Sequence, residues 1–257
     1  MLCLYKKIGE TPLQCLDELR LAKPEYKNTV LSYAGRLDPM AEGLMLVLVD
    51  EENKEREKYL GLDKEYECEV LLGVGTDTYD ILGKVVGILP EPVSTSVSKY
   101  ALIESHLASF VGRYAQKYPP YSSKTLHGKA LFEYAKSETL LEEDTPSREV
   151  EVYGIEIISI EQISLLSLET RIFKNISLVT GDFRQAEIIE KWKSFFKLKY
   201  PQKTLPVIKI KVVCGSGVYI RSIANELGKK LGVPALALSI LRTKVGEYDI
   251  SKVLNFR

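Results

Sequence analysis

The stretch GRLDPMAEGLMLVLV, residues 35–49, places one carboxylate in a tight turn directly before a run of apolar residues. Pro39 fixes its own backbone and disfavours helix at the preceding residue, so the sequence predicts a loop that holds Asp38 beside a buried strand at residues 44–49. A carboxylate held in this way is suited to act as a nucleophile or a general base. Leu-Asp-Pro is also a common turn, and the stretch alone leaves both interpretations open.

Composition limits the classes of protein that this chain can belong to. Its 257 residues, 45% of them hydrophobic, are enough for one large domain or for one domain with an inserted piece. The longest apolar run is about six residues, far below the roughly 20 that span a bilayer, so we expect no membrane partner. Lys+Arg and Asp+Glu balance at 35 each, and an RNA-binding face would have to come from local segregation of charge.

Cysteine and histidine usage gives no sign of a disulfide framework or a metal centre. The four cysteines are scattered without a CxxC pair, which indicates reduced thiols in a cytoplasmic protein. With only two histidines, His106 and His127, we expect no metal site and no cofactor. The GVGT at residues 73–76 is followed by no predicted helix, and Ser216 lacks a plausible histidine partner for hydrolase chemistry.

Hydrophobic periodicity predicts strands and helices that are interspersed without a regular βαβ rhythm, which favours an α+β fold. A helix should begin at Pro12 with Thr11 as its N-cap, and YECEVLLG, residues 66–73, should form a half-buried strand. A later helix should end at Gly232. Its core stripe comprises Ile220, Ile223, Ala224, Leu227 and Leu231.

Four segments resemble, in the same order, the TruB family of pseudouridine synthases. They are GRLDPMAEGLMLVLV, KEYECEVLLGVGTDTYDILGKVV, QKYPPYSSKTLHGKALFEYA, and GVYIRSIANELG followed by LRTKVG. The resemblance implies a pseudouridine-synthase-like α+β fold with a mixed, mainly antiparallel sheet, flanking helices and a thumb loop. It also implies isomerisation of uridine to pseudouridine, with uridine 55 of the tRNA T-loop as the target.

The resemblance assigns roles to four residues. Asp38 would be the catalytic nucleophile, Arg221 would pair with it, and Leu241 would line the wall of the pocket. Tyr66 would be a platform for a flipped base, or would transfer a proton through its phenol. Isomerisation breaks the bond from base to sugar, rotates the base and rejoins it through carbon. This reaction involves no redox change and needs no cofactor or metal.

Two residues, one just before the first segment and one within it, depart from the family pattern. Tyr33 stands where the family usually has a histidine, and its ring could still stack near the target base. Arg36 replaces a usual threonine, and the resulting GRLD is similar to the HRLD of the RluA family. An RluA-like or other RNA target is therefore an alternative. A non-catalytic RNA-binding or RNA-folding protein is a third, although such a protein would not need Asp38, Tyr66 and Arg221 together.

The expected organisation is a single catalytic domain over residues 1–257, with an insertion at about 161–205 and without the C-terminal PUA domain of most members. We expect a cytoplasmic monomer that binds RNA, specifically tRNA. The insertion should start strand-like and then form a helix over residues 182–198 with Asp182 as its N-cap. The expected apolar face comprises Phe183, Ile189, Trp192 and Phe196. The basic end of that helix, Lys191, Lys193, Lys197 and Lys199, would contact RNA phosphates or would be ordinary solvated surface.

Overall fold

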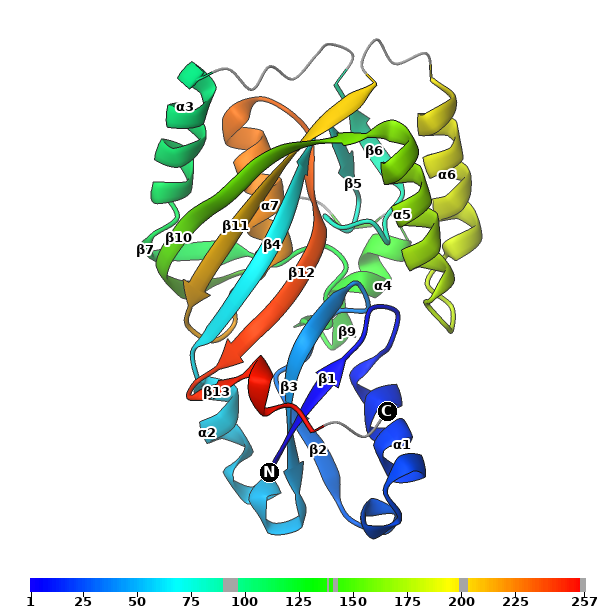
Figure 1. The fold of residues 1–257 in the computed structure, drawn as a ribbon, viewed down its shortest axis with the longest axis vertical. Coiled ribbons are helices and arrows are strands. Elements are labelled where there is room, and N and C mark those ends of the chain that lie inside the picture. The colour runs from blue at the N-terminus through cyan, green and yellow to red at the C-terminus, as the bar shows by residue number, and fades with distance from the viewer. Residues whose placement is uncertain (90–96, 138, 141–142, 199–202, 255–257) are drawn as a thin grey trace.

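A nine-stranded sheet runs through the molecule and carries helices on both faces (Figure 1). The structure, a computed structural model, describes residues 1–89, 97–137, 139–140, 143–198 and 203–254. Within these residues the strand order is β1-β3-β12-β4-β11-β10-β7, with β2 on β3 and β13 on β12. The pairing of β3 with β12 is parallel and the other pairings are antiparallel. The predicted fold class, a mixed and mainly antiparallel sheet with flanking helices, is confirmed.

The strands of the large sheet are β1 Leu2–Lys6, β2 Leu31–Ala34, β3 Ala41–Val49, β4 Lys64–Leu72, β7 Gly112–Lys117, β10 Ser147–Ser164, β11 Thr204–Cys214, β12 Ala235–Val245 and β13 Tyr248–Asp249. Two small hairpins pair β5 Val74–Thr76 with β6 Val85–Ile88, and β8 Thr125–Leu126 with β9 Lys129–Ala130. The helices are α1 Pro12–Ala22, α2 Arg56–Gly61, α3 Val97–Ala108, α4 Leu131–Lys136, α5 Leu165–Ser177, α6 Gln185–Lys197 and α7 Ile220–Leu231. Short 3₁₀ turns lie at η1 Pro24–Tyr26, η2 Asp50–Glu55 and η3 Ile250–Lys252.

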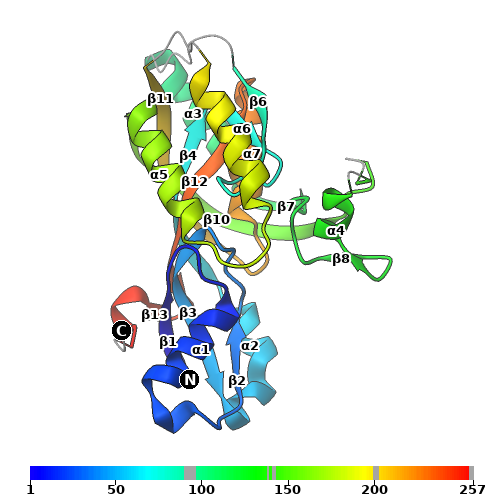
Figure 2. The same ribbon diagram turned by 90° about the vertical axis from the view of Figure 1, so that its right-hand side faces the viewer.

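Two buried clusters lie on opposite faces of the central strands. Val70 of β4 packs in a cluster with α3 and α7, whereas its neighbour Leu71 packs in a cluster with α5 and α6. Because successive side chains of a strand point to opposite faces, this alternation separates the two helix layers. In Figure 2, α5 and α6 lie in front of the sheet and α7 lies behind it.

Helix ends with local sequence signals lie where the sequence predicts them. The Thr11 hydroxyl accepts a bond of 3.2 Å from the Gln14 amide, and the Gln14 side chain bonds back to the Thr11 amide, which completes a capping box before Pro12. Helix α7 ends at Gly232 in the left-handed conformation (φ 69°). Its predicted stripe is buried except for Leu231, which packs at the margin of the cluster.

Alternation along β4 directs Tyr66 toward the α7 layer. Tyr66, Cys68 and Val70 are buried as predicted, while on the other face Glu67 pairs with Lys209 of β11 and Glu69 pairs with Arg171 of α5. Glu67, for example, lies 2.7 Å from the ammonium of Lys209. The period-two pattern is therefore a consequence of burial on one face and cross-strand ion pairs on the other.

The stretch from 161 to 205 differs from its prediction in three ways. Its first part continues β10 and then forms α5, a helix that the strand-like interpretation of this region missed. Helix α6 begins at Gln185, because Gly181 (φ 88°) and Arg184 (φ 62°) hold the preceding backbone in left-handed conformations. Its buried face is therefore Ile188, Trp192 and Phe195, with Ile189 and Phe196 only partly buried.

None of the helices in the described part of the chain is long and apolar enough to cross a membrane. All four cysteines are buried, and none of them is in a disulfide.

Candidate active site

A cleft of about 870 Å³ is lined by the loop before β3 and by the start of α7, among other segments. Its walls come from the loop after β2, from β4 and β12, from the start of α7, from the thumb segment (residues 116–135) and from the loop between α5 and α6. Five of the six residues predicted from the sequence line it: Tyr33, Arg36, Asp38, Tyr66 and Arg221. These residues come from three separate parts of the chain, and the fold brings them to one cleft.

The loop that carries Asp38 is held from behind by a buried lysine. The Lys6 ammonium is fully buried and donates to the carbonyl of Ala41 at 2.6 Å and to that of Pro39 at 3.4 Å. The Gly9 amide also donates to the Pro39 carbonyl at 2.9 Å. Burial lowers the pKa of Lys6 to about 8. Asp38 therefore lies on a fixed loop, and its side chain is 32% exposed to the cleft.

Arg221 joins three segments of the site. Its Nε lies 2.8 Å from Oδ2 of Asp38, the pairing that the family resemblance implies. Its Nη1 donates to the Thr78 carbonyl at 2.7 Å, and its Nη2 donates to the Tyr121 carbonyl at 3.2 Å. The side chain is 3% exposed, so these contacts hold a buried cation in one orientation. The carboxylate of Asp38 is thus oriented by a guanidinium that has little freedom to move.

A second carboxylate, Asp80, shares Arg221 with Asp38. Its Oδ2 lies 3.7 Å from Nε of Arg221, and its Oδ1 accepts bonds from the Thr78 hydroxyl at 2.8 Å and the Leu82 amide at 2.9 Å. Burial raises the pKa of Asp80 to about 6; Arg221 opposes this rise and the charge of Asp38 adds to it. Asp80 had no predicted role, although its place in TDTYD, where a Thr-x-Asp turn can form a hydrogen bond within itself, was a signal.

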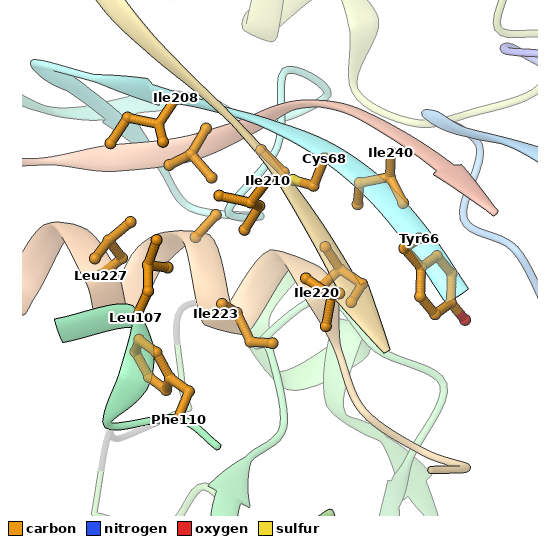
Figure 3. Close-up of a cluster of buried hydrophobic side chains, with 14 of the residues drawn as sticks. Tyr66, Cys68, Leu107, Phe110, Ile208, Ile210, Ile220, Ile223, Leu227 and Ile240 are labelled. Carbon is orange, nitrogen blue, oxygen red and sulfur yellow. The ribbon is translucent and has the colours of Figure 1, made fainter. Parts of the chain in front are cut away.

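Tyr66 both packs in the core and faces the cleft. Figure 3 shows its ring at one end of the buried cluster, beside Ile240, with the hydroxyl directed away from the cluster. The residue is 8% exposed. Burial raises the pKa of Tyr66, and Arg242 opposes the rise. Its phenol is therefore protonated at neutral pH, and the exposed part of the ring offers a flat apolar surface.

The prediction that Leu241 lines the pocket wall is wrong by one residue. The cleft is lined by Ile240 and Arg242, whose side chains point to the face of β12 opposite to that of Leu241. The register pairs Ile240 with Cys68 and Arg242 with Tyr66, so both share the face of the predicted aromatic platform. Short apolar runs such as SIL contain no signal for which residue faces the site, because the face depends on this long-range register.

Arg242 is a further residue that the sequence analysis did not single out. It is 1% exposed, and it donates from Nε to the Leu44 carbonyl at 2.7 Å and from Nη2 to the Gly35 carbonyl at 3.1 Å. These bonds tie β12 to both ends of the loop that carries Asp38. The loop is thus clamped by Arg242 on one side and by Lys6 on the other.

Cations gather at the mouth of the cleft. Arg36 is exposed and donates to the Tyr33 hydroxyl at 3.4 Å, which places both departures from the family pattern at the rim. Arg148 and Lys136 are also exposed lining residues. Exposed cations around an opening suit a polyanion such as a nucleic acid backbone. The described residues contain no group of three or more His, Cys, Asp or Glu placed to hold a metal ion.

Sequence comparisons identify relatives over nearly the whole chain. Residues 23–176 match the family described as TruB family pseudouridylate synthase (N terminal domain). The chain is similar to the tRNA pseudouridine synthase B of Deinococcus deserti, with 30% identity over 98% of this chain and 75% of that protein. It is also similar to the enzyme of the same name from Bacillus subtilis, with 27% identity over 100% of this chain and 68% of that protein.

Structure comparisons agree on the fold. A solved Cbf5 complex with Nop10 and Gar1 contains a chain that matches 96% of this one, with a TM-score of 0.57 and 17% identity. An archaeal box H/ACA complex of Nop10 and Cbf5 matches 99% of this chain, with a TM-score of 0.56 and 16% identity. The present chain spans about half the length of these solved chains.

Proposed function

The chain belongs to the TruB family of pseudouridylate synthases, and from this membership we propose that it isomerises uridine to pseudouridine in tRNA, at position 55 of the T-loop. The observation that carries the proposal is the Asp38–Arg221 pair, 2.8 Å apart, at the base of a cleft lined by Tyr66. A nucleophilic carboxylate, an oriented cation and an aromatic surface are the groups that this reaction needs.

The proposed mechanism begins with a flipped uridine entering the cleft, since the reacting atoms are not accessible in a stacked base. Asp38 attacks the base or the anomeric carbon of the ribose, and the bond between N1 and C1′ breaks. The base turns, C5 bonds to C1′, and the bond to Asp38 breaks, which returns the free carboxylate. C5 then loses a proton and N1 gains one. Atoms and electrons balance without an oxidant or a second substrate.

The other residues support this sequence of steps. Arg221 holds the Asp38 carboxylate in one orientation, aimed at the base. Tyr66 stacks against the base while it turns, with Ile240 as the side wall, and its hydroxyl lies where it can exchange a proton. The cations of the rim, Arg36 and Arg148, hold phosphates of the RNA.

The test is pseudouridine formation by the purified chain on a tRNA transcript, with position mapping. Asp38→Asn should abolish turnover, because the amide is a poor nucleophile, and should leave RNA affinity within about tenfold of wild type, because phosphate contacts dominate affinity. Glu42→Gln is the matched control. It makes the same carboxylate-to-amide change on β3, where Glu42 accepts a bond from Tyr5 and does not line the cleft. Turnover by the Asp38→Asn protein near the normal rate would refute the mechanism.

A second target class is favoured by one observation. Arg36, the residue that makes the loop similar to that of the RluA family, lies at the rim where RNA would enter. If the protein modifies another RNA by the same chemistry, Asp38 would still be essential, but the pseudouridine that depends on it would map to that RNA instead of to position 55 of tRNA. Mapping in cells that lack the protein separates the two targets. A non-catalytic RNA-folding role predicts wild-type phenotypes for Asp38→Asn and no change in the map.

We further propose that residues 1–257 act as one catalytic domain in which α5 and α6 are an insertion, and that the protein is a cytoplasmic monomer. Four buried cysteines without a disulfide among them suit a reducing compartment. Sedimentation of the purified chain tests the monomer.

A further inference from the structure

The helical hairpin formed by α5 and α6 packs directly behind the two loops that carry Asp38 and Asp80. Trp192 of α6 is fully buried against Met40, Ile81 and Leu82, and its Nε1 donates to the Ile81 carbonyl at 3.2 Å. The hairpin lies between β10 and β11 in the chain, and Figure 2 shows it in front of the sheet with its connecting loop at its lower end.

The loop between α5 and α6 reaches the cleft itself. Asp182, Phe183 and Arg184 are lining residues. Arg184 has a left-handed backbone (φ 62°), a conformation that non-glycine residues adopt at a cost and keep when their surroundings hold them. The Asp182 carboxylate accepts a bond of 3.3 Å from the Arg184 amide, and this contact helps to hold the turn.

The Arg184 side chain makes two specific contacts and has little exposed surface left. Its Nη1 and Nη2 lie 2.8 Å and 3.4 Å from the two carboxylate oxygens of Asp77. Its guanidinium carbon lies 4.1 Å from the centre of the Tyr121 ring, a cation–π arrangement. The side chain is 11% exposed. A guanidinium already bound to a carboxylate and stacked on a ring is poorly placed to take up an RNA phosphate.

The two partners of Arg184, Asp77 and Tyr121, lie in the two segments whose backbone carbonyls bind Arg221. The Tyr121 backbone carbonyl accepts a bond from Nη2 of Arg221, and the carbonyl of Thr78, the residue next to Asp77, accepts one from Nη1. Two arginines from distant segments therefore meet the same two pieces of chain. Arg184 fixes the tyrosine ring and the neighbouring carboxylate, and Arg221 uses the adjoining carbonyls.

We propose that Arg184 is a positioning residue of the active site: the α5–α6 loop holds Tyr121 and the Asp77–Thr78 segment in place for Arg221, and Arg221 in turn orients Asp38. The inference rests on the proposed function and extends it, since it gives the hairpin a role in the chemical step rather than in RNA affinity.

The test separates the chemical step from binding. Single-turnover rates with saturating enzyme and, independently, the Kd for the same tRNA are measured for wild type, Arg184→Gln and Arg184→Lys. The rate of Arg184→Gln should fall by about tenfold to a hundredfold, the usual effect of a small misplacement of reacting groups, with Kd within about threefold. Arg184→Lys should recover little, because an ammonium cannot make the bidentate pair and stack on the ring together.

Two further measurements test whether Arg184 acts on Arg221 through the Tyr121 ring. Glu187→Gln is the matched control: it removes the 3.3 Å ion pair with Lys84, which also joins α6 to the segment after Asp80 but lies outside the cleft, and the rate should not change. Combining Arg184→Gln with Tyr121→Leu should lower the rate by less than the product of the two single effects, because both changes act through the same ring.

Four results would overturn the inference. One is an unchanged single-turnover rate in Arg184→Gln, with or without a lower melting temperature, which would make Arg184 a purely structural contact. Another is a weaker Kd with a flatter salt dependence and a normal rate, which would make it an RNA contact. A third is that the rate losses of Arg184→Gln and Tyr121→Leu multiply in the double variant, which would show that Arg184 does not act through Tyr121. A wild-type chain without turnover on any RNA would refute the proposed function, and the inference with it.

Discussion

At the scale of single residues, the site depends on how one guanidinium is shared. Nε of Arg221 lies 2.8 Å from a carboxylate oxygen of Asp38 and 3.7 Å from one of Asp80, and its Nη1 and Nη2 each donate to a backbone carbonyl. The closer contact is made to Asp38, whose side chain is partly exposed, and the longer contact is made to the buried Asp80. Asp80 therefore balances the buried cation without competing for the position nearest the substrate.

Asp80 should leave a signature in the pH dependence of stability. Its pKa in the folded protein is about 6, above the ordinary value of 3.8, so the folded state binds more protons than the unfolded state between these values. Protonation of Asp80 thus stabilises the fold at low pH, and this stabilisation is lost as pH rises through about 6. Relative to Asp80→Asn, whose amide does not titrate, wild type should gain stability as pH falls from about 7 to 4. Urea unfolding of both proteins across this range measures the difference, and a constant difference would contradict the prediction.

Tyr66 can be tested with two substitutions that separate its ring from its hydroxyl. If the ring is the main contribution, Tyr66→Phe should keep activity, and Tyr66→Leu should lose roughly 1–3 kcal/mol of stacking in RNA binding. If the hydroxyl transfers a proton, Tyr66→Phe should bind RNA normally and turn over very slowly. Kd and single-turnover rates distinguish these results. A lower melting temperature with unchanged catalysis in both variants would leave Tyr66 with core packing alone.

At the scale of secondary structure, elements with local signals were predictable and those fixed by distant contacts were not. The capping box at Thr11 and the stripe of α7 depend on residues within a few positions of one another, so sequence alone predicts them. The start of α6 depends on a left-handed Arg184, whose side chain is held by Asp77, more than 100 residues away. Helix α5 was missed although Leu168, Ile172 and Ile176 repeat at helical spacing, because the preceding strand residues obscured the change of period.

The same division applies to the candidate site. Motif residues such as Asp38 and Arg221 were identified because the family resemblance names them, and their 2.8 Å separation required the fold to bring together residues 183 positions apart. Ile240 was confused with Leu241 because the face of a strand follows from its pairing partner. Arg184 gave no sequence signal as a site residue, because it lies outside the four motif segments and its contacts with Asp77 and Tyr121 are made through tertiary packing.

Helix α6 should be needed for the stability of the loops it covers. Trp192→Ala removes a fully buried indole and its bond to the Ile81 carbonyl, and a core substitution of this size costs about 3–5 kcal/mol of unfolding free energy. Trp192→Phe should cost less, because it keeps an aromatic ring beside Phe195 and Phe196. Leu166→Ala on α5, at a side chain that is 74% exposed, is the control and should change little. Denaturant unfolding gives all three values; equal losses for Trp192→Ala and Leu166→Ala would show that α6 is not packed as described.

At the scale of the whole molecule, a chain with no net charge must bind a polyanion through the placement of its cations. The structure offers two candidate groups: the rim of the cleft, and the exposed lysines toward the C-terminal end of α6. Helix α6 has 13 residues and is therefore about 20 Å long, and it is its N-terminal end that reaches the cleft. The sequence predicted that lysines at the basic end of this helix could contact RNA. Lys193 and Lys197 are exposed on a part of α6 remote from the α5–α6 loop, and Lys199 lies outside the described residues.

The rim should therefore dominate the electrostatic part of RNA binding. Each phosphate contact that is lost lowers the slope of log affinity against log salt by roughly 0.7–0.9, so changing Arg36 and Arg148 to Gln should flatten the slope by about 1.5 and weaken binding at low salt. Lys193→Gln with Lys197→Gln removes the same number of charges far from the cleft and should leave the slope nearly unchanged. Filter binding of one tRNA over a range of salt concentrations measures both. If the salt slope flattens for the lysine double variant and stays unchanged for the arginine double variant, the RNA lies across the helical hairpin. Helix α6 would then have the RNA-binding role that its lysines suggest.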